Sequence, residues 1–209
     1  MTKFQSKIDK KLVSELPKEH FPGRIIMIYT EADARKAVDY LNRCPVVGVD
    51  TETRPSFKKG RTNNVALLQV STPDTCFLFR LNHIGIPDFL VDFLSNDVLK
   101  IGLSLKDDFH VLCRSDKKSN NLREGNWIDL QDFVSSYGIE EKSLQKIYAI
   151  LFGMKISKNQ RLSNWEADVL TEAQQLYAAT DAWATLRIYQ ALTKEHKTEE
   201  LKIDEVNKR

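Results

Sequence analysis

Two patterns of hydrophobic and polar positions alternate along the chain. Short apolar runs rich in Val, Ile, Leu and Phe and bounded by turn-forming residues predict strands, over residues 24–29, 46–50, 65–71, 76–81, 99–105 and 127–133. Apolar residues at helical spacing predict helices, over residues 30–43, 86–96, 106–114, 143–153 and 170–192. This order of elements is typical of an α/β fold with a mixed sheet of about five strands flanked by helices, and it predicts an antiparallel hairpin or meander near the start.

Capping residues predict where two of the helices begin. Thr30 with Asp33 forms a capping-box variant, and Thr171 with Gln174 forms the same motif before the clearest helix of the chain. Gly153 is the type of residue that ends a helix, because glycine adopts the left-handed conformation at low cost.

The length of 209 residues fits one domain with a full core, and 42% hydrophobic with 29% charged residues is typical of a globular protein. Residues 1–24 are polar, contain two prolines and are expected to form a loosely attached leader with room for one short helix. Residues 25–193 are predicted to form the folded domain, and residues 194–209 a charged tail. The net charge of +2 identifies no partner, so a prediction of nucleic-acid binding depends on local charge.

The chain has no recognisable targeting, membrane or cofactor signature. No apolar run has the length of a signal-peptide core or a membrane span, so we expect a cytoplasmic protein with no membrane partner. Cys44, Cys76 and Cys113 are odd in number and form no CxxC pair, which predicts reduced thiols. No GxGxxG follows the first strand and no GxxxxGK[ST] occurs, so no organic cofactor is expected at a Rossmann or P-loop site.

Asp50 and Glu52 end a valine-rich strand in the stretch VVGVDTETRP. Because side chains alternate along a strand, residues two apart point to the same face. Two buried carboxylates on one face repel each other, and burying them costs several kcal/mol unless a cation lies between them. A divalent metal ion would remove that cost. The alternative is that the strand ends here and both acids face water.

Asp181 lies in the middle of the predicted helix 170–192, which is apolar on most of its surface. A carboxylate in a buried helix is expected to be paired or to bind a metal ion. Tyr177 precedes it by one turn, so the phenol and the carboxylate are predicted to lie side by side. The alternative is a buried aspartate that accepts hydrogen bonds from the tyrosine or a backbone amide.

Asp108 is the acid of the helix 106–114 that is predicted to face the core, because it shares a helix face with Leu105 and Leu112. By itself it is more commonly explained as a first-turn acid favoured by the helix dipole. Four such acids in one core would, however, be strongly destabilising without cations. An all-oxygen ligand set suits Mg²⁺ or Mn²⁺, and two such ions about 3.5–4 Å apart are a common device for phosphodiester cleavage.

The segments that carry these acids resemble the three exonuclease motifs of the DEDDy-type 3′–5′ exonucleases: VDTE, GLSLKDDFHVL and LYAATDAWA. Tyr177 marks the DEDDy branch, since the histidine branch would have His at the position of Leu176. The stretches SNWEADVLTEAQQLYAATDAWATLRIY and NNVALLQVSTPDTCFLF are similar to the Werner syndrome exonuclease / ribonuclease D-like group. The resemblance spans about residues 25–192.

This resemblance implies a ribonuclease H-like fold and a metal-dependent 3′–5′ exonuclease domain over residues 25–193, acting on DNA with RNA as a second possibility. It implies that Asp50, Glu52 and Asp181 hold the first of two divalent ions, Mg²⁺ or Mn²⁺. Asp50 would also contact the second ion, which Asp108 supports, and Tyr177 would orient the attacking water. Hydrolysis would proceed without a covalent intermediate.

Local positive charge agrees with a nucleic-acid partner that offers single-stranded or recessed 3′ ends. Basic loops follow the first acidic strand and precede the last helix, and phosphate contacts from such loops hold a strand without reading its sequence. The predicted contact residues are Arg54, Phe57, Lys58, Lys59, Arg61, Lys106, Lys158 and Arg161. The alternative for both loops is a solvated lysine-rich turn. The three tryptophans are predicted to lie in the core.

A non-catalytic nucleic-acid-binding or scaffold domain of the same fold is the second functional hypothesis. The presence of all four acids and the tyrosine favours the enzyme. Ribonuclease D-like proteins carry additional helical domains, whereas 17 residues follow the last predicted helix. This difference favours an exonuclease closer to the Werner type.

Overall fold

The fold is built on one six-stranded mixed sheet with the strand order β1-β4-β3-β2-β5-β6. The computed structural model describes residues 4–56, 63–106, 108–109, 112 and 125–207, with side chains as far as residue 194. The strands are β1 (Arg24–Ile28), β2 (Val46–Thr53), β3 (Val65–Ser71), β4 (Thr75–Phe79), β5 (Leu99–Gly102) and β6 (Trp127–Asp129). The helices are α1 (Lys10–Glu15), α2 (Glu31–Leu41), α3 (Leu81–Ile84), α4 (Asp88–Ser95), α6 (Leu130–Phe133), η2 (Val134–Tyr137), α7 (Leu144–Phe152) and α8 (Glu172–Asn207).

The centre of the sheet is an antiparallel meander of β2, β3 and β4. On either side the pairing is parallel: β1 pairs with β4, β5 with β2, and β6 with β5. The predicted mixed α/β architecture with a meander near its start is therefore confirmed, with six strands where about five were expected.

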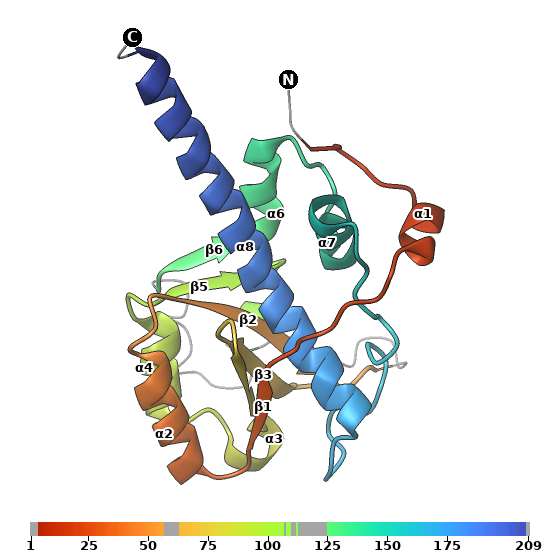
Figure 1. Cartoon of the computed structure of the whole chain (residues 1–209). Helices are drawn as coiled ribbons and strands as arrows, with labels where there is room; N and C mark the ends of the chain where they lie inside the picture. Colours follow the sequence, from red (N-terminus) through yellow and green to blue (C-terminus); the bar gives the residue numbers. More distant parts are fainter. Residues whose placement is uncertain (1–3, 57–62, 107, 110–111, 113–124, 208–209) are drawn as a thin grey trace.

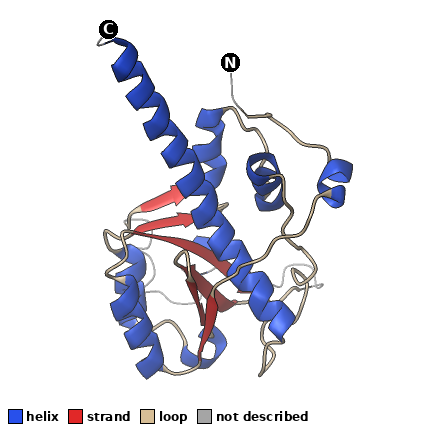
Figure 2. Cartoon of the chain, viewed as in Figure 1, coloured by secondary structure: helices blue, strands red, loops and turns tan. Residues whose placement is uncertain are grey.

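Helices cover both faces of the sheet, as Figures 1 and 2 show. The helices α2 and α4 lie against one face, and a hydrophobic cluster that includes Leu41, Leu90 and Leu94 fills the space beneath them. The helix α8 crosses the other face, where its alanines and Trp183 pack on the strands together with residues of α7. Each β2 residue therefore faces either α2 and α4 or the long helix α8.

The helix starts at Thr30 and Thr171 are as predicted. Thr30 accepts a hydrogen bond from the backbone N–H of Asp33, and Thr171 and Gln174 cap each other's backbone N–H groups. The helix α8 continues to Asn207, well beyond the predicted end at residue 192.

Three strands end two or more residues earlier than predicted. The apolar run 127–133 was expected to be one strand, but β6 ends at Asp129 and α6 follows it directly. The reason is the Asp129 carboxylate, which caps α6 by accepting from Gln131 N–H and also accepts from the backbone N–H groups of Ser104 and Leu105. These bonds likewise end the predicted strand 99–105 at Gly102. Similarly, β4 ends at Phe79 and the short helix α3 follows.

The N-terminal segment packs on the domain, so the expectation of a loose leader is wrong. Phe21 is buried, its ring centroid lies 6.0 Å from that of Trp183, and its backbone N–H donates to Thr180 of α8. Glu19 forms an ion pair of 2.6 Å with Arg187 and accepts a hydrogen bond from the Tyr148 hydroxyl. The predicted short helix is present as α1.

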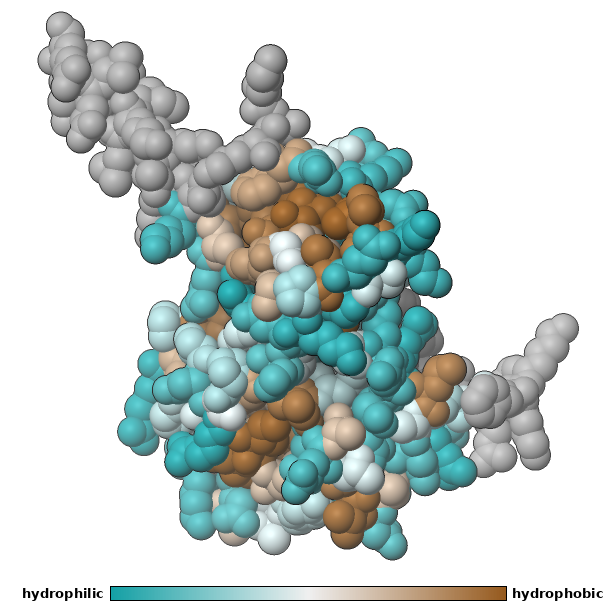
Figure 3. All heavy atoms as spheres, turned by 45° about the vertical axis from the view of Figure 1, so that its right-hand side comes forward, coloured by the Kyte–Doolittle hydropathy of each residue, from teal (hydrophilic) through white to brown (hydrophobic). Residues whose placement is uncertain are grey.

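The face drawn in Figure 3 is hydrophilic over much of its area, with hydrophobic residues gathered in separate patches. Among the large hydrophobic side chains of the described residues, Leu162 and Val169 are the most exposed, and both belong to the loop before α8. Within the described part of the chain, no helix has both the length and the apolar character needed to cross a membrane.

Candidate metal centre

Three of the predicted acids meet where β2 passes beneath α8. Asp50 and Glu52 lie two residues apart on β2, and Asp181 comes from α8. Carboxylate oxygens of all three lie within 4.8 Å of one another. Gly48 permits this approach, because a Cβ atom at that position would overlap the Ala182 carbonyl oxygen of α8. The helix α8 therefore lies directly on β2 at the residue next to Asp181.

Burial raises the pKa of each acid above its ordinary value, and repulsion from neighbouring acids adds to this effect at Asp50 and Glu52. The pKa of Asp50 is well above its usual range, because of burial and the charges of Asp181, Glu52 and Asp108. Burial and the neighbouring acids raise the pKa of Glu52 to about 9. Burial raises the pKa of Asp181 to about 7, opposed by the Tyr177 hydrogen bond and by Lys158. The described positive groups thus offset only part of the repulsion, and the all-oxygen cluster fits a hard divalent cation.

Asp108 lies beside this cluster and is connected to it through Thr51. The Thr51 hydroxyl donates a hydrogen bond to the Asp108 carboxylate. Thr51 follows Asp50 on β2, so the bond places the fourth acid at the same end of the strand. Asp108 is not one of the three acids that converge within 4.8 Å, but its charge raises the pKa of both Asp50 and Glu52.

Tyr177 lies next to Asp181, as predicted. Its side chain is buried, and the proximity of its hydroxyl group to the Asp181 carboxylate lowers the pKa of Asp181, the direction expected when the phenol points its hydrogen at the carboxylate. Burial and the charges of Asp181 and Glu52 raise the pKa of Tyr177, which therefore keeps its proton. The ring of buried Trp165 lies 5.9 Å from the Tyr177 ring, centroid to centroid, and limits its movement.

Two of the predicted basic residues lie at the edge of the acid cluster. Lys158 and Arg161 line a cavity of about 220 Å³ together with Tyr177 and Asp181. The positive charge of Arg161 lowers the pKa of Glu52, and burial followed by repulsion from Arg161 lowers the pKa of Lys158. The cavity is therefore lined by one carboxylate of the acid cluster, that of Asp181, and by two cations.

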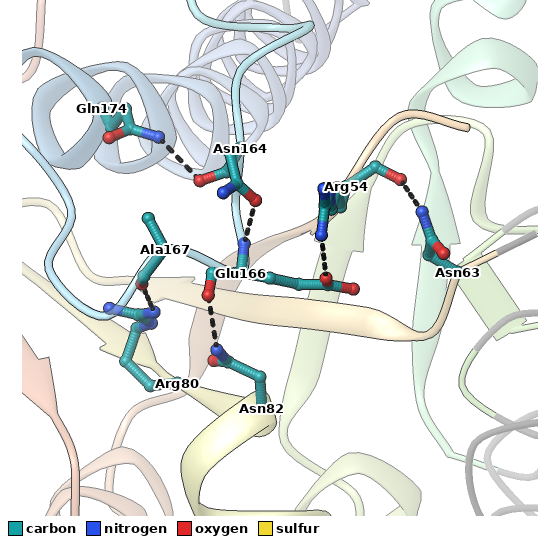
Figure 4. Close-up of polar contacts among 8 residues, drawn as sticks. All are labelled: Arg54, Asn63, Arg80, Asn82, Asn164, Glu166, Ala167 and Gln174. Atoms are coloured by element: carbon teal, nitrogen blue, oxygen red, sulfur yellow. Dashed lines mark hydrogen bonds and ion pairs between the residues drawn. The ribbon is translucent and has the colours of Figure 1, made fainter. Parts of the chain in front are cut away.

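Arg54 is exposed beyond the end of β2 and forms an ion pair with Glu166. The Arg54 Nη1–Glu166 Oε2 distance is 3.1 Å, and Asn63 donates to the Arg54 carbonyl oxygen at 2.8 Å (Figure 4). The pair joins the acidic strand to the loop before α8.

That loop is fixed on the sheet by two residues at the end of β4 and the start of α3. The fully buried Arg80 donates to the carbonyl oxygen of Ala167, and Asn82 donates to that of Glu166 (Figure 4). Arg80 also donates to the carbonyl oxygen of Asp168. These bonds hold the segment that leads into α8, and so help to position Asp181.

The other predicted nucleic-acid contacts are Lys106 and four residues of the first basic loop. Lys106 is exposed at the start of the helix that carries Asp108. Phe57, Lys58, Lys59 and Arg61 lie outside the described residues. Lys155, part of the second basic loop, donates to the Ser14 carbonyl oxygen in the N-terminal segment.

Sequence reasoning missed Thr51 and Arg80. Thr51 lies between Asp50 and Glu52 in the sequence, and a hydroxyl at this position could have indicated a hydrogen-bond donor to a neighbouring acid. Arg80 contacts Ala167 and Asp168, which lie more than 80 positions later in the chain, so no local sequence pattern indicates this contact.

A family model described as 3′–5′ exonuclease matches residues 25–197. The chain belongs to the 3′–5′ exonuclease family. The DEDDy-type resemblance and the predicted enzyme class are confirmed. The bifunctional 3′–5′ exonuclease/ATP-dependent helicase WRN of Mus musculus is 32% identical over 87% of this chain and 13% of that protein. A 3′–5′ exonuclease of Arabidopsis thaliana is 30% identical over 84% of this chain and 66% of that protein.

The chain thus spans less than two thirds of either relative. Among solved structures, the Nibbler EXO domain of Aedes aegypti superimposes with a TM-score of 0.76 over 86% of this chain and 93% of that one, at 21% identity. Escherichia coli RNase D gives a TM-score of 0.72 over 84% of this chain and 46% of that one, also at 21% identity. These likenesses confirm the ribonuclease H-like fold.

Proposed function

We propose that this domain is a metal-dependent exonuclease that removes nucleotides from the 3′ end of DNA, with RNA as a second possible substrate. The observation that carries the proposal is the convergence of Asp50, Glu52 and Asp181 within 4.8 Å, from a strand and a helix far apart in the sequence. Together with the family assignment, this cluster supports phosphodiester hydrolysis.

In this proposal Asp50, Glu52 and Asp181 hold one divalent ion, and Asp50 with Asp108 holds a second. Two Mg²⁺ or Mn²⁺ ions would supply a nucleophilic water at neutral pH and stabilise the leaving oxygen. The protein contributes four carboxylates on fixed elements, and the Thr51 hydroxyl orients one of them. An organic cofactor is not needed for this hydrolysis.

Tyr177 is proposed to orient the attacking water. In this role its hydroxyl hydrogen points at Asp181, which leaves the phenolic oxygen to accept a hydrogen bond from water. The raised pKa of Tyr177 makes it a poor acid in this site. Its role is therefore positioning, which requires the hydroxyl but no change of charge.

Replacing Tyr177 by Phe should lower kcat about a hundredfold while the Kd for Mn²⁺ changes less than about threefold. The reason is that the variant loses the hydroxyl that positions water but keeps every carboxylate. Kinetics on a labelled strand and calorimetric titration with Mn²⁺ measure the two quantities. Tyr189→Phe, on the same helix but outside the site, is the matched control. Equal kcat for Tyr177→Phe and wild type would exclude the proposed role.

Lys158 and Arg161 are proposed to contact phosphates of the strand that enters the cavity. Arg161→Gln should weaken binding of a single strand about tenfold at low salt and reduce the slope of log K against log salt by about 0.7. Fluorescence anisotropy in EDTA, where no cleavage is expected, measures both quantities. Lys36→Gln, an exposed lysine on α2, is the control. An unchanged salt slope in Arg161→Gln would rule out the phosphate contact.

Digestion of 5′-labelled strands tests the proposal as a whole. DNA and RNA, single-stranded and with recessed 3′ ends, are incubated with Mg²⁺ or Mn²⁺. A ladder that shortens from the 3′ end and disappears in EDTA is expected, and the relative rates identify the preferred sugar. Tight binding without cleavage of any strand would favour the scaffold hypothesis instead.

A further inference from the structure

Gln69 is a fully buried polar residue in the middle of the otherwise almost entirely apolar strand β3. Neither its Nε2 nor its Oε1 atom has a hydrogen-bond partner in the structure, as far as the chain is described. A buried polar group without a partner costs about 1–3 kcal/mol. The side chain amide is thus a buried donor and acceptor that the fold itself leaves unused.

The pairing of the strands places this amide beside the acid cluster. In the β2–β3 register Gln69 lies opposite Asp50, and in the β3–β4 register it lies opposite Leu78. Directly opposite residues of antiparallel strands point to the same face, with Cβ atoms about 4.5–5.5 Å apart. Of the two cross-strand neighbours only Asp50 is polar, so its carboxylate is the partner that the strand pairing offers to the Gln69 amide.

We propose that Gln69 is a positioning residue for Asp50, whose carboxylate accepts a hydrogen bond from Gln69 Nε2 when a divalent ion is bound. The inference rests on the proposed function, because it takes Asp50 as a metal ligand. Metal binding fixes Asp50 in its ionised form, which is a stronger acceptor than the neutral acid. A donor on β3 would then restrict the rotation of the Asp50 carboxylate.

Replacing Gln69 by Met separates this role from simple packing. Methionine has a similar length and no amide, so the bond to Asp50 is lost while the volume is nearly kept. Loss of a hydrogen bond to a metal-ligating carboxylate weakens metal binding about 10–100-fold. We therefore expect the Kd of the full chain for Mn²⁺, measured by calorimetry, to increase by that factor. The stability of the metal-free variant to urea should be unchanged or increased, since two unpaired buried groups are removed.

Leu67→Met is the matched control, because Leu67 is buried in the same strand and lies opposite Glu52 as Gln69 lies opposite Asp50. Its Kd for Mn²⁺ should remain within about twofold of wild type. A Gln69→Met variant that binds Mn²⁺ as tightly as wild type overturns the role of Gln69 and leaves the metal centre intact. Failure of the wild-type chain to bind Mn²⁺ would instead remove the metal centre, and this inference with it.

Wild-type protein offers a second readout if Gln69→Met does not fold. The side-chain amide of Gln69 can be followed by NMR during titration with diamagnetic Mg²⁺. Formation of a hydrogen bond should shift the Gln69 amide proton downfield in wild type, and the shift should be absent in Asp50→Asn. An amide signal that does not respond to Mg²⁺ in the wild type contradicts the proposal.

Discussion

Asp50→Asn should reduce 3′-end cleavage by about a thousandfold or more, the scale seen when a group that stabilises transition-state charge is removed. Asp50 is proposed to contact both ions, so its loss affects the nucleophile and the leaving oxygen together. Asparagine has the shape of aspartate but neither its charge nor its full set of acceptor oxygens. The variant should fold, because replacing one buried like charge relieves repulsion within the cluster. Rates on 5′-labelled strands at saturating Mg²⁺ measure the effect.

Asp33→Asn is a suitable control for this experiment. Asp33 is exposed near the start of α2, where it pairs with Lys36, and its loss should leave the cleavage rate within about twofold of wild type. If Asp50→Asn retained a substantial part of the activity while folding normally, the acid cluster would not be the catalytic site.

Glu52→Gln should stabilise the metal-free protein relative to wild type and reduce the stabilisation that a bound metal ion gives. The pKa of Glu52 is raised to about 9 in the folded state, whereas an unfolded glutamate has a pKa of about 4.3. Between these values the folded state binds more protons than the unfolded state. The contribution of Glu52 to the free energy of unfolding of the metal-free wild type should therefore be highest below about pH 4. This contribution should fall as the pH rises toward 9.

Metal-free Glu52→Gln should lack most of this decline. At pH 8 it should be about 1–3 kcal/mol more stable than wild type, because an unsatisfied buried group costs about that much. Adding Mg²⁺ should stabilise the wild type more than the variant, because a ligand stabilises the state to which it binds. Urea unfolding at pH 5 and pH 8, in EDTA and in Mg²⁺, measures all four cases. A metal-free wild type that gains stability between pH 5 and pH 8 relative to the variant would contradict the pKa assignment.

The site shows how far local sequence patterns can predict a fold. The i, i+2 spacing predicted that Asp50 and Glu52 share one face of a strand, and the apolar surroundings of Asp181 predicted a paired or metal-binding carboxylate. Their convergence depends on tertiary contact, above all on the missing side chain of Gly48 beneath Ala182. A glycine in a strand is a signal of close approach, but it does not identify which helix approaches.

Contacts between distant segments account for what the sequence did not predict. The polar segment before β1 has little hydrophobic periodicity, yet Phe21 is buried through a contact with Thr180, 159 residues away. The end of β6 depends on one carboxylate, since Asp129 satisfies three backbone N–H groups from two segments. The apolar pattern of residues 127–133 fits a strand and a buried helix equally well, so the cap decides between them.

The most direct test of the proposed metal centre is anomalous X-ray scattering from crystals of the full chain grown with Mn²⁺. We predict a manganese peak within bonding distance of Asp50, Glu52 and Asp181, and a second peak on the side of Asp50 that faces Asp108. One peak alone would preserve the site and contradict the two-ion arrangement. The absence of any peak at these carboxylates in crystals that bind manganese elsewhere would contradict the central claim.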